Sequence, residues 1–519
     1  MNRTSLGRHA LRCLLWLLIS VLAGTVLMTA VYAIPTGRMH TNVDRSIPLL
    51  ENEGGSFFWA PPDDMSTRLD GYTDAIMMQT AIYNRDRHHL LQEAMLNRRV
   101  EFYETGDPIT SLIRYVYGEH RGPVSSYARY WNGYLLYLKP LLLFFSLPQI
   151  RTMDACFQFC LAAAVLLLAF RKGGRRLAVP MALMILSLNP ISTAMSLQYT
   201  SMYVLTLGGT LAMLSLETWK KENGFLLFLF LGIGTAFFDF LTYPAAAVGV
   251  CLALQALLDS RTGKQAFLRA LGSGAAWGFG YGGMWGSKWV LAELLTGEKV
   301  LSDALNQVRI RSGSQVSDLA GSARISFWGV VGKNLSVYLT AGYVLLAIVL
   351  LLGLLWLLLG KHYRFSPDKG RLAVLALCFA VPFVWYLLLR NHSSQHYCIA
   401  IAAHSYSGAV VRLKTVNEVV GAYYVPASDS TEFTMFAVDN VYLASGPDIL
   451  GFEVIKGSVA LDYITVTNSS QVDREVYGIS GSCAGIFFFF LSLMSFTLHS
   501  HLGEAGVSQT CGSGSRQSS

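Results

Sequence analysis

Charged side chains are scarce in this sequence. Only 14% of its 519 residues are Asp, Glu, Lys or Arg, whereas about a quarter of the residues in an ordinary soluble domain are charged. Hydrophobic residues make up 53% of the chain. This balance argues against a soluble globular protein and indicates that much of the surface faces lipid.

Metal-binding and redox motifs are also missing. The eight cysteines include no pair at the spacing of a metal site or a catalytic dithiol. Cys156 and Cys160 share one face of a predicted helix, where packing as small apolar residues is favoured over a paired-thiol function. The sequence predicts no metal site, because no residues stand at the spacing that divalent-metal ligands require. It leaves the identity of any cofactor unknown.

Long apolar runs predict the fold class. A helix needs about 20 largely uncharged residues to cross the hydrocarbon core. The sequence therefore predicts an all-α membrane bundle of about 9–10 transmembrane helices in the cell membrane, with the lipid bilayer as its first partner. The expected spans are 11–34, 153–170, 177–196, 199–216, 225–241, 243–258, 267–291, 335–360 and 371–389, with a tenth at 484–498.

Basic residues set the expected orientation. The formal net charge is +7, but Lys and Arg are concentrated in short links between apolar runs, which is typical of topology signals and argues against a nucleic acid partner. If successive helices alternate in direction, all the basic links lie on one face, which the positive-inside rule makes cytoplasmic. The links are the N-terminus with Arg3, Arg8 and Arg12, then 171–176, Lys220-Lys221, 261–269 and 361–371.

The same alternation divides the chain into domains, with the N-terminus in the cytoplasm and the polar loop 35–133 outside. The first run exceeds the roughly 7–15 apolar residues of a signal peptide, so we expect an uncleaved anchor. The predicted domains are a signal-anchor helix at 1–34, an extracytoplasmic loop with an interfacial helix at 35–152, a polytopic bundle at 153–397, a strand-rich extracytoplasmic segment at 398–483, and a hydrophobic segment with a disordered tail at 484–519.

Two local patterns refine the predicted bundle. Asn189-Pro190 should kink the helix expected at 177–196, because proline removes a helical hydrogen bond. The run at 267–291 is rich in glycine, which permits close helix approach.

Three carboxylates are candidate catalytic groups. Charge in the bilayer is costly and tends to be retained for function, and Asp239 lies at the expected outer end of its helix. Asp70 and Asp74 would share one face if their segment is helical, and a carboxylate there can act as a general base. The alternatives are a carboxylate that reaches the interface or caps a neighbour for Asp239, and a solvated acidic turn before an amphipathic helix for the other two.

Cationic and aromatic residues near the expected outer ends are candidate substrate-binding groups. Lys288, Arg309 and Arg311 could bind phosphate oxygens or, equally, lipid headgroups. Histidines four positions apart could share a helix face, but no third metal ligand is evident, and ordinary interfacial histidines are the simpler interpretation. The remaining candidates of this group are Trp131, Tyr199, Asn391, His392 and His396.

Arg129-Tyr130-Trp131-Asn132-Gly133-Tyr134, the Phe-Phe-Asp-Phe-Leu-Thr-Tyr-Pro segment at 237–244 and the Arg-Asn-His-Ser segment from 390 are similar to poorly characterised polytopic membrane proteins of Gram-positive bacteria. With its anchor helix, large acidic first loop and polar outer pocket, the chain more broadly resembles the GT-C membrane glycosyltransferases over about 1–397.

That resemblance implies transfer of a sugar from a polyprenyl-phosphate carrier to an extracytoplasmic acceptor, with inversion. The acidic base of the superfamily's first loop would map to Asp70 or Asp74. The chain departs from the superfamily in two respects: the only adjacent acidic pair, Asp63-Asp64, lies nearly thirty residues beyond the first helix, and strands replace helices after 398.

Two other functions fit the same residues. A transporter or flippase for a lipid-linked glycan could use the same bundle and polar pocket, although no internal repeat is visible and the charges gather at one face. A non-catalytic protein that assembles cell-envelope machinery could use the external loops as binding surfaces.

Overall fold

The computed structural model describes residues 3–54, 69–83, 89–100, 108–119, 124–216, 220–239, 242–312, 315–318, 321–324, 368–388, 396–414, 419–429, 433–442 and 451–468, with a few isolated positions. The helix predicted at 484–498 and the Asp63-Asp64 pair lie outside the described residues, as does nearly all of 335–360.

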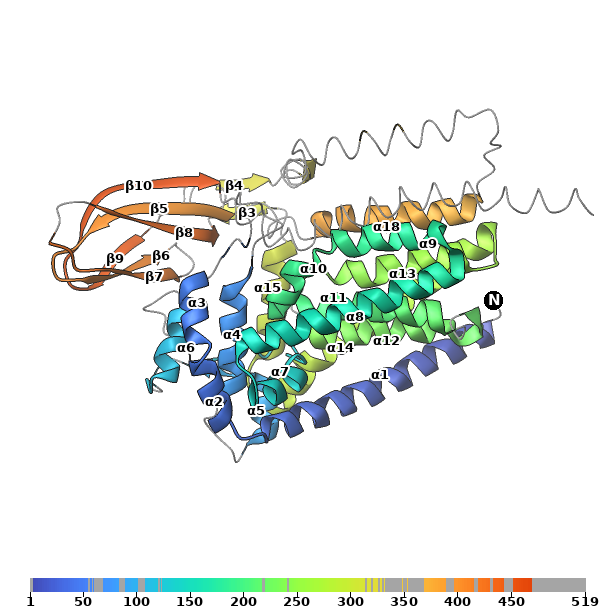
Figure 1. Cartoon of the computed structure of the whole chain (residues 1–519), viewed down its shortest axis with the longest axis horizontal. Helices are drawn as coiled ribbons and strands as arrows, with labels where there is room; N and C mark the ends of the chain where they lie inside the picture. The colour runs from blue at the N-terminus through green and yellow to red at the C-terminus, as the bar shows by residue number, and fades with distance from the viewer. Residues whose placement is uncertain are drawn as a thin grey trace, which may run out of the picture.

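Helices dominate the described chain and run side by side as an elongated bundle (Figure 1), which agrees with a predominantly helical fold. By length and composition, two of them are apolar enough to cross a membrane: Gly7–Tyr32 and Leu147–Gly173. The other predicted spans that the structure describes form helices that are shorter or less apolar. The bundle comprises α1 (Arg3–Tyr32), α8 (Leu147–Gly173), α9 (Arg175–Ser187), α10 (Pro190–Met195), α11 (Leu197–Ser215), η3 (Glu222–Gly224), α12 (Phe225–Phe238), α13 (Pro244–Leu258), α14 (Gly263–Thr296) and α18 (Lys369–Leu388).

The predicted helix at 177–196 is broken rather than kinked. Asn189 has φ +52°, in the left-handed region, and its side chain accepts a hydrogen bond from the backbone N–H of Ser192. Asn tolerates this conformation better than most residues. Proline at 190 then starts α10, where its missing N–H costs nothing. A second break at Ser196, in an extended conformation, separates α10 from α11.

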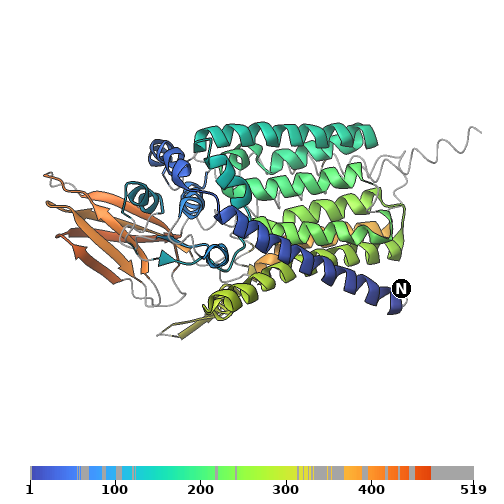
Figure 2. The same ribbon diagram turned by 90° about the horizontal axis from the view of Figure 1, so that it is seen from below.

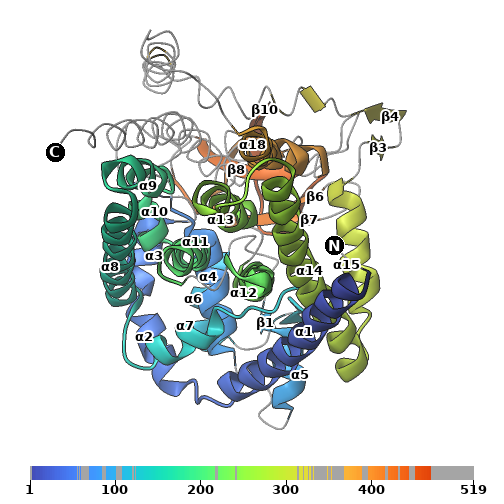
Figure 3. The ribbon, with the colours of Figure 1, turned by 90° about the vertical axis from the view of Figure 1, so that its right-hand side faces the viewer.

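The helices of the first loop pack against the end of the bundle where α1 finishes (Figures 1 and 3). Two buried lysines stabilise this arrangement, Lys139 within the loop and Lys288 between the loop and the bundle. Lys139 donates to the carbonyl of Ala81 at 2.9 Å, and Lys288 donates to those of Ala94 and Met95 at 3.1 and 2.8 Å. A cation is favourable near a helix C-terminus, and both contacts lie in the last turns of loop helices. The loop elements are α2 (Gly37–Asp44), α3 (Ile47–Glu53), α4 (Gly71–Ile82), α5 (Leu90–Leu96), β1 (Arg99–Val100), α6 (Pro108–Val116), β2 (Val124–Ser125) and α7 (Leu135–Leu142).

Glycines allow α12 and α14 to approach closely. A Cβ atom at Gly280 would meet the carbonyl oxygen of Leu229, and one at Gly232 would meet that of Trp277. Backbone therefore faces backbone across this pair, as the glycine-rich run predicted.

Four of the basic links meet at the opposite end of the bundle, where the N-terminus lies (Figure 1). Arg12 donates to the side chain of Asn223 at 2.7 Å, next to the link that carries Lys220-Lys221. Arg269 donates to the carbonyl of Lys221, and Arg371 to that of Asp259. The links are therefore neighbours in space although they are distant in sequence.

Strands form where the sequence predicted a strand-rich segment. Two three-stranded antiparallel sheets, ordered β10-β5-β8 and β7-β6-β9, enclose a small core that includes Ile401, Val411 and Leu413. They lie beyond the end that carries the loop helices (Figures 1 and 2). The strands are β5 (His396–His404), β6 (Ala409–Lys414), β7 (Val419–Val425), β8 (Thr434–Tyr442), β9 (Gly451–Lys456) and β10 (Ala460–Asn468); α15 (Val300–Ser312), β3 (Gln315–Asp318) and β4 (Gly321–Arg324) follow α14.

Candidate functional site

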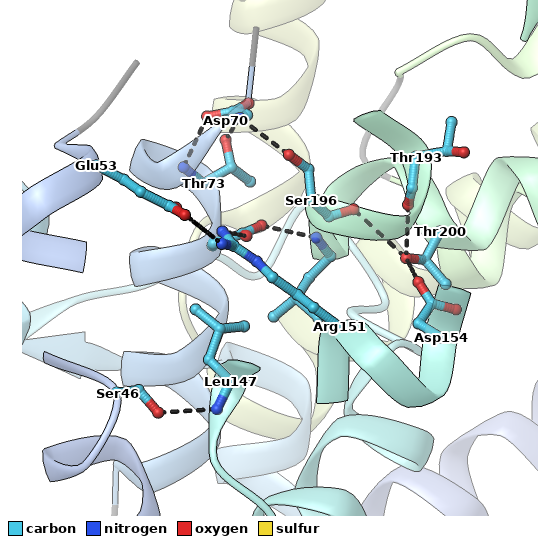
Figure 4. Close-up of polar contacts among 12 residues, drawn as sticks. Ser46, Glu53, Asp70, Thr73, Leu147, Arg151, Asp154, Thr193, Ser196 and Thr200 are labelled. Carbon is cyan, nitrogen blue, oxygen red and sulfur yellow. Dashed lines mark hydrogen bonds and ion pairs between the residues drawn. The ribbon is translucent and has the colours of Figure 1, made fainter. Parts of the chain in front are cut away.

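A buried polar network joins the first loop to the start of α8 (Figure 4). The backbone N–H of Leu147, the first residue of α8, donates to the hydroxyl of Ser46 at 2.9 Å. One turn later, Arg151 donates from Nη1 to both carboxylate oxygens of Glu53 at 2.8 Å and from Nη2 to Oδ2 of Asp74 at 3.4 Å. All three charged side chains are buried, so the loop and the bundle are joined by ionic contacts shielded from water.

Asp74 is fully buried, which overturns the alternative of a solvated acidic turn at this position. Its Oδ1 atom accepts from the backbone N–H of Leu197, the first residue of α11, at 2.9 Å. Burial raises the pKa of the Asp74 carboxyl to about 7, although Arg151 and the Leu197 N–H pull the pKa down. Two carboxylates share one guanidinium in this network, so a proton on Asp74 leaves it electrically neutral.

Asp70 ends the loop that precedes α4. Its carboxylate accepts from the N–H and the hydroxyl of Thr73, both at 2.9 Å, which makes it the N-cap of α4. Its own N–H donates to Ser196 Oγ at 3.0 Å. The expected helix is present, and both residues contact the junction between α10 and α11, Asp70 through its backbone N–H and Asp74 through its carboxylate.

Asp154 belongs to the same region and was missed by the sequence reasoning. Its Oδ2 atom accepts from Thr200 Oγ1 at 2.6 Å and from Gln158 Nε2 at 2.9 Å. Gln158 also donates to the carbonyl of Thr193 at 3.1 Å. The predicted span started at 153, which obscured a usable signal: Arg151 and Asp154 are three residues apart and share a face in the first turns of an apolar helix.

Asp239 lies at the break between α12 and α13. It is buried and accepts from the N–H of Thr242 and from the Thr242 hydroxyl, so a capping role, one of the two alternatives, is present. The neighbouring Tyr243 donates its hydroxyl to the carbonyl of Tyr199 at 3.0 Å, and the two rings lie 6.5 Å apart. The structure thus brings Asp239 and Tyr199 to one end of the bundle.

Trp131 and Lys288 form part of the packing between the loop and the bundle. The Trp131 indole donates to the carbonyl of Met284 at 2.8 Å, and the Lys288 ammonium lies 5.3 Å from the Trp131 ring. Lys288 is fully buried, and its hydrogen bonds go to the carbonyls at the end of α5. A phosphate would have to displace these contacts, which argues against the phosphate-binding role predicted for Lys288.

The other predicted residues are only partly described. Arg309 is exposed on α15, and His396 begins β5 by pairing with Tyr442. The side chains of Arg311 and His396 lie outside the described residues, as do Asn391 and His392 entirely. Among the residues that are described, no three His, Cys, Asp or Glu side chains gather as a metal site requires.

The fold and site define a helical protein with two helices able to cross a membrane and a buried acidic network at one end. Comparison with known protein families, curated proteins and solved structures gave no match for this chain.

Proposed function

We propose that this protein is a polytopic membrane glycosyltransferase of the GT-C type, which moves a sugar from a polyprenyl-phosphate carrier to an extracytoplasmic acceptor. One observation carries the proposal: the carboxylates of Asp74, on α4, and Asp154, on α8, accept hydrogen bonds from Leu197 and Thr200, at the end of the bundle covered by the first loop. The carboxylate of Asp70 caps the same helix as Asp74, and its backbone N–H donates to Ser196. Carboxylates concentrated beside a membrane-embedded helix end suit a reaction on a lipid-linked substrate.

The proposed topology has the N-terminus in the cytoplasm and the acidic network outside. The contacts of Arg12, Arg269 and Arg371 support it, because they gather basic links at one end of the bundle, as the positive-inside rule requires of cytoplasmic links. Single cysteines at Thr41 and Lys220, in a variant without the native cysteines, test this. A membrane-impermeant maleimide should label the first in intact cells and the second only after permeabilisation.

The proposed reaction needs a base and phosphate stabilisation. The acceptor hydroxyl oxygen attacks the anomeric carbon, the bond from that carbon to the carrier phosphate breaks, and the hydroxyl proton passes to a carboxylate. The carrier phosphate leaves with the bonding electron pair. Exposed Arg309, beside Arg311 in sequence, is the group proposed to stabilise it, since guanidinium groups match phosphate oxygens.

The test is transfer by purified full-length protein in nanodiscs supplied with a polyprenyl-phosphate sugar and an acceptor glycan. Asp70→Asn, Asp74→Asn and Asp239→Asn are each compared with Asp303→Asn, which removes only a half-exposed carboxylate paired with Arg129. If one of the first three carboxylates is the base, its variant should lose at least about 100-fold in rate, as for other general bases, when transfer is measured well below the variant's own unfolding midpoint. Undiminished transfer in all three variants contradicts this site assignment.

A flippase for a lipid-linked glycan is the second candidate, and the breaks at Asn189 and Ser196 favour it, since broken helices are common at transporter binding sites. Proteoliposomes without acceptor separate the two functions. A flippase moves the labelled carrier-linked sugar across the bilayer under these conditions, whereas a transferase leaves it in place.

A further inference from the structure

We infer that the Asp154 carboxylate and the Tyr203 hydroxyl form a sugar-recognition subsite that accepts neutral or amino sugars and rejects acidic ones. This inference rests on the proposed function, because it names the class of donor sugar. It concerns residues that the sequence did not single out.

The two carboxylate oxygens of Asp154 differ: Oδ2 accepts hydrogen bonds from protein side chains, and Oδ1 is available to a ligand. Thr200 and Gln158 both donate to Oδ2, at 2.6 and 2.9 Å, which fixes the orientation of the group. None of the described residues hydrogen-bonds Oδ1, and the side chain is only partly buried. An oriented carboxylate with an open oxygen is a ready acceptor for a hydroxyl or ammonium group of a ligand.

Tyr203 supplies the second observation. It lies one turn beyond Thr200 on α11, is 0% exposed, and its hydroxyl has no hydrogen-bond partner among the described residues. Thr200, one turn before Tyr203 on the same helix, donates to the Asp154 carboxylate, which places the Asp154 and Tyr203 side chains in neighbouring turns of α8 and α11. An unsatisfied buried hydroxyl is unfavourable, and a ligand group that pairs with it removes that cost.

The charge balance determines which ligands fit. Arg151, one turn before Asp154 on α8, is committed to Glu53 and Asp74. No Lys, Arg or His of the described chain forms an ion pair with Asp154. The subsite is therefore negative and partly shielded from water, where a uronate or a phosphorylated sugar is repelled and an amino sugar is attracted.

Aromatic rings provide the apolar surface that a sugar ring requires. Tyr199 precedes Thr200, the residue that donates to Asp154, and its partly buried ring lies 6.5 Å from the buried ring of Tyr243. The C–H face of a pyranose packs against such rings, while its hydroxyls donate to the carboxylate. Phenols, aromatic faces and an open carboxylate together favour a polyol over a purely apolar or anionic ligand.

The experiment measures binding of three short-chain polyprenyl-phosphate donors, carrying a neutral hexose, an amino hexose or a uronic acid, to full-length protein in nanodiscs. Wild-type protein should bind the first two at least about tenfold more tightly than the third. Asp154→Asn should abolish the discrimination against the uronic acid donor and weaken the amino donor most. Tyr203→Phe should weaken the neutral and amino donors several-fold and leave that discrimination in place.

The controls are Asp303→Asn and Tyr117→Phe, which change an exposed carboxylate and an exposed phenol. The subsite is overturned if wild-type protein binds all three donors equally, or if the discrimination survives in Asp154→Asn. If the same preparation still transfers sugar, the glycosyltransferase proposal stands. Failure of every donor to bind overturns both.

Discussion

Arg151 and Asp74 are 77 positions apart in the sequence and meet in a buried contact, with Nη2 of the arginine 3.4 Å from Oδ2 of the aspartate. The same guanidinium holds Glu53. Loop helices α3 and α4 are thereby fixed to α8, which also carries Asp154. The geometry of the candidate site therefore depends on this network.

Arg151→Met should destabilise the protein by about 3–5 kcal/mol, because it leaves two buried carboxylates without their cation. The thermal unfolding midpoint in nanodiscs is the measurement. Combining the change with Glu53→Gln and Asp74→Asn should recover much of the loss, since the buried negative charges are then gone. Arg114→Met is the matched control: Arg114 pairs with an exposed carboxylate, Glu119, and its loss should change stability by less than about 1 kcal/mol. Equal losses of stability in Arg151→Met and Arg114→Met would refute the stabilising role of the buried network.

The pH dependence of stability should carry a signature of Asp74. Its pKa is about 7 in the folded protein and 3.8 as an isolated group, so the folded state binds the proton more tightly than the unfolded state. The contribution of Asp74 is therefore fully present below about pH 4 and is lost as the pH rises through 7. Unfolding midpoints measured from pH 4 to 8 should fall less steeply in Asp74→Asn than in wild type. Parallel curves for the two proteins would rule out this titration.

Gly280→Ala should destabilise the protein by about 1–3 kcal/mol, because the added methyl group meets the Leu229 carbonyl and forces α12 and α14 apart. Gly278→Ala, two residues earlier on the exposed face of α14, has nothing within 4 Å of the new Cβ. It should leave stability unchanged or raise it slightly, as alanine is the better helix former. Comparing the unfolding midpoints of Gly280→Ala and Gly278→Ala separates the effect of helix propensity from that of packing. If both midpoints change in the same direction, the close approach of α12 and α14 is contradicted.

Lys288→Met should loosen α5, because the carbonyls of Ala94 and Met95 lose their buried donor at a cost of about 1–3 kcal/mol. Hydrogen exchange followed by mass spectrometry should show faster exchange in peptides covering 90–97. Lys299→Met, at an exposed position after α14, serves as the control and should leave those peptides unchanged. If Lys288 instead binds phosphate, the variant should lose donor affinity while exchange in 90–97 stays the same.

The sequence predicted some acidic residues of the candidate site and missed another, for a physical reason. Asp70, Asp74 and Asp239 stood out because a carboxylate is conspicuous beside an apolar run. Whether such a carboxylate caps a helix, pairs with a buried cation or faces a ligand depends on partners such as Thr73, Arg151 and Leu197, which local patterns do not reveal. Asp154 was overlooked because it lay within the first residues of a predicted span.

Local patterns by themselves determined where helices form and where they end. Apolar runs, basic links, Asn189-Pro190 and the glycines of α14 each act through neighbouring residues or the helix period. The sequence therefore predicted a mainly helical fold and a close helix approach, and it located the interruption at Asn189-Pro190, although as a kink and not as the break that forms. Only the tertiary structure decided the charge pairing. Groups that meet across 46 to 123 positions, as the Asp154 carboxylate does with the Thr200 hydroxyl and the Asp74 carboxylate with the Leu197 N–H, are brought together by the packing of whole helices. Burial at that junction raises the pKa of Asp74.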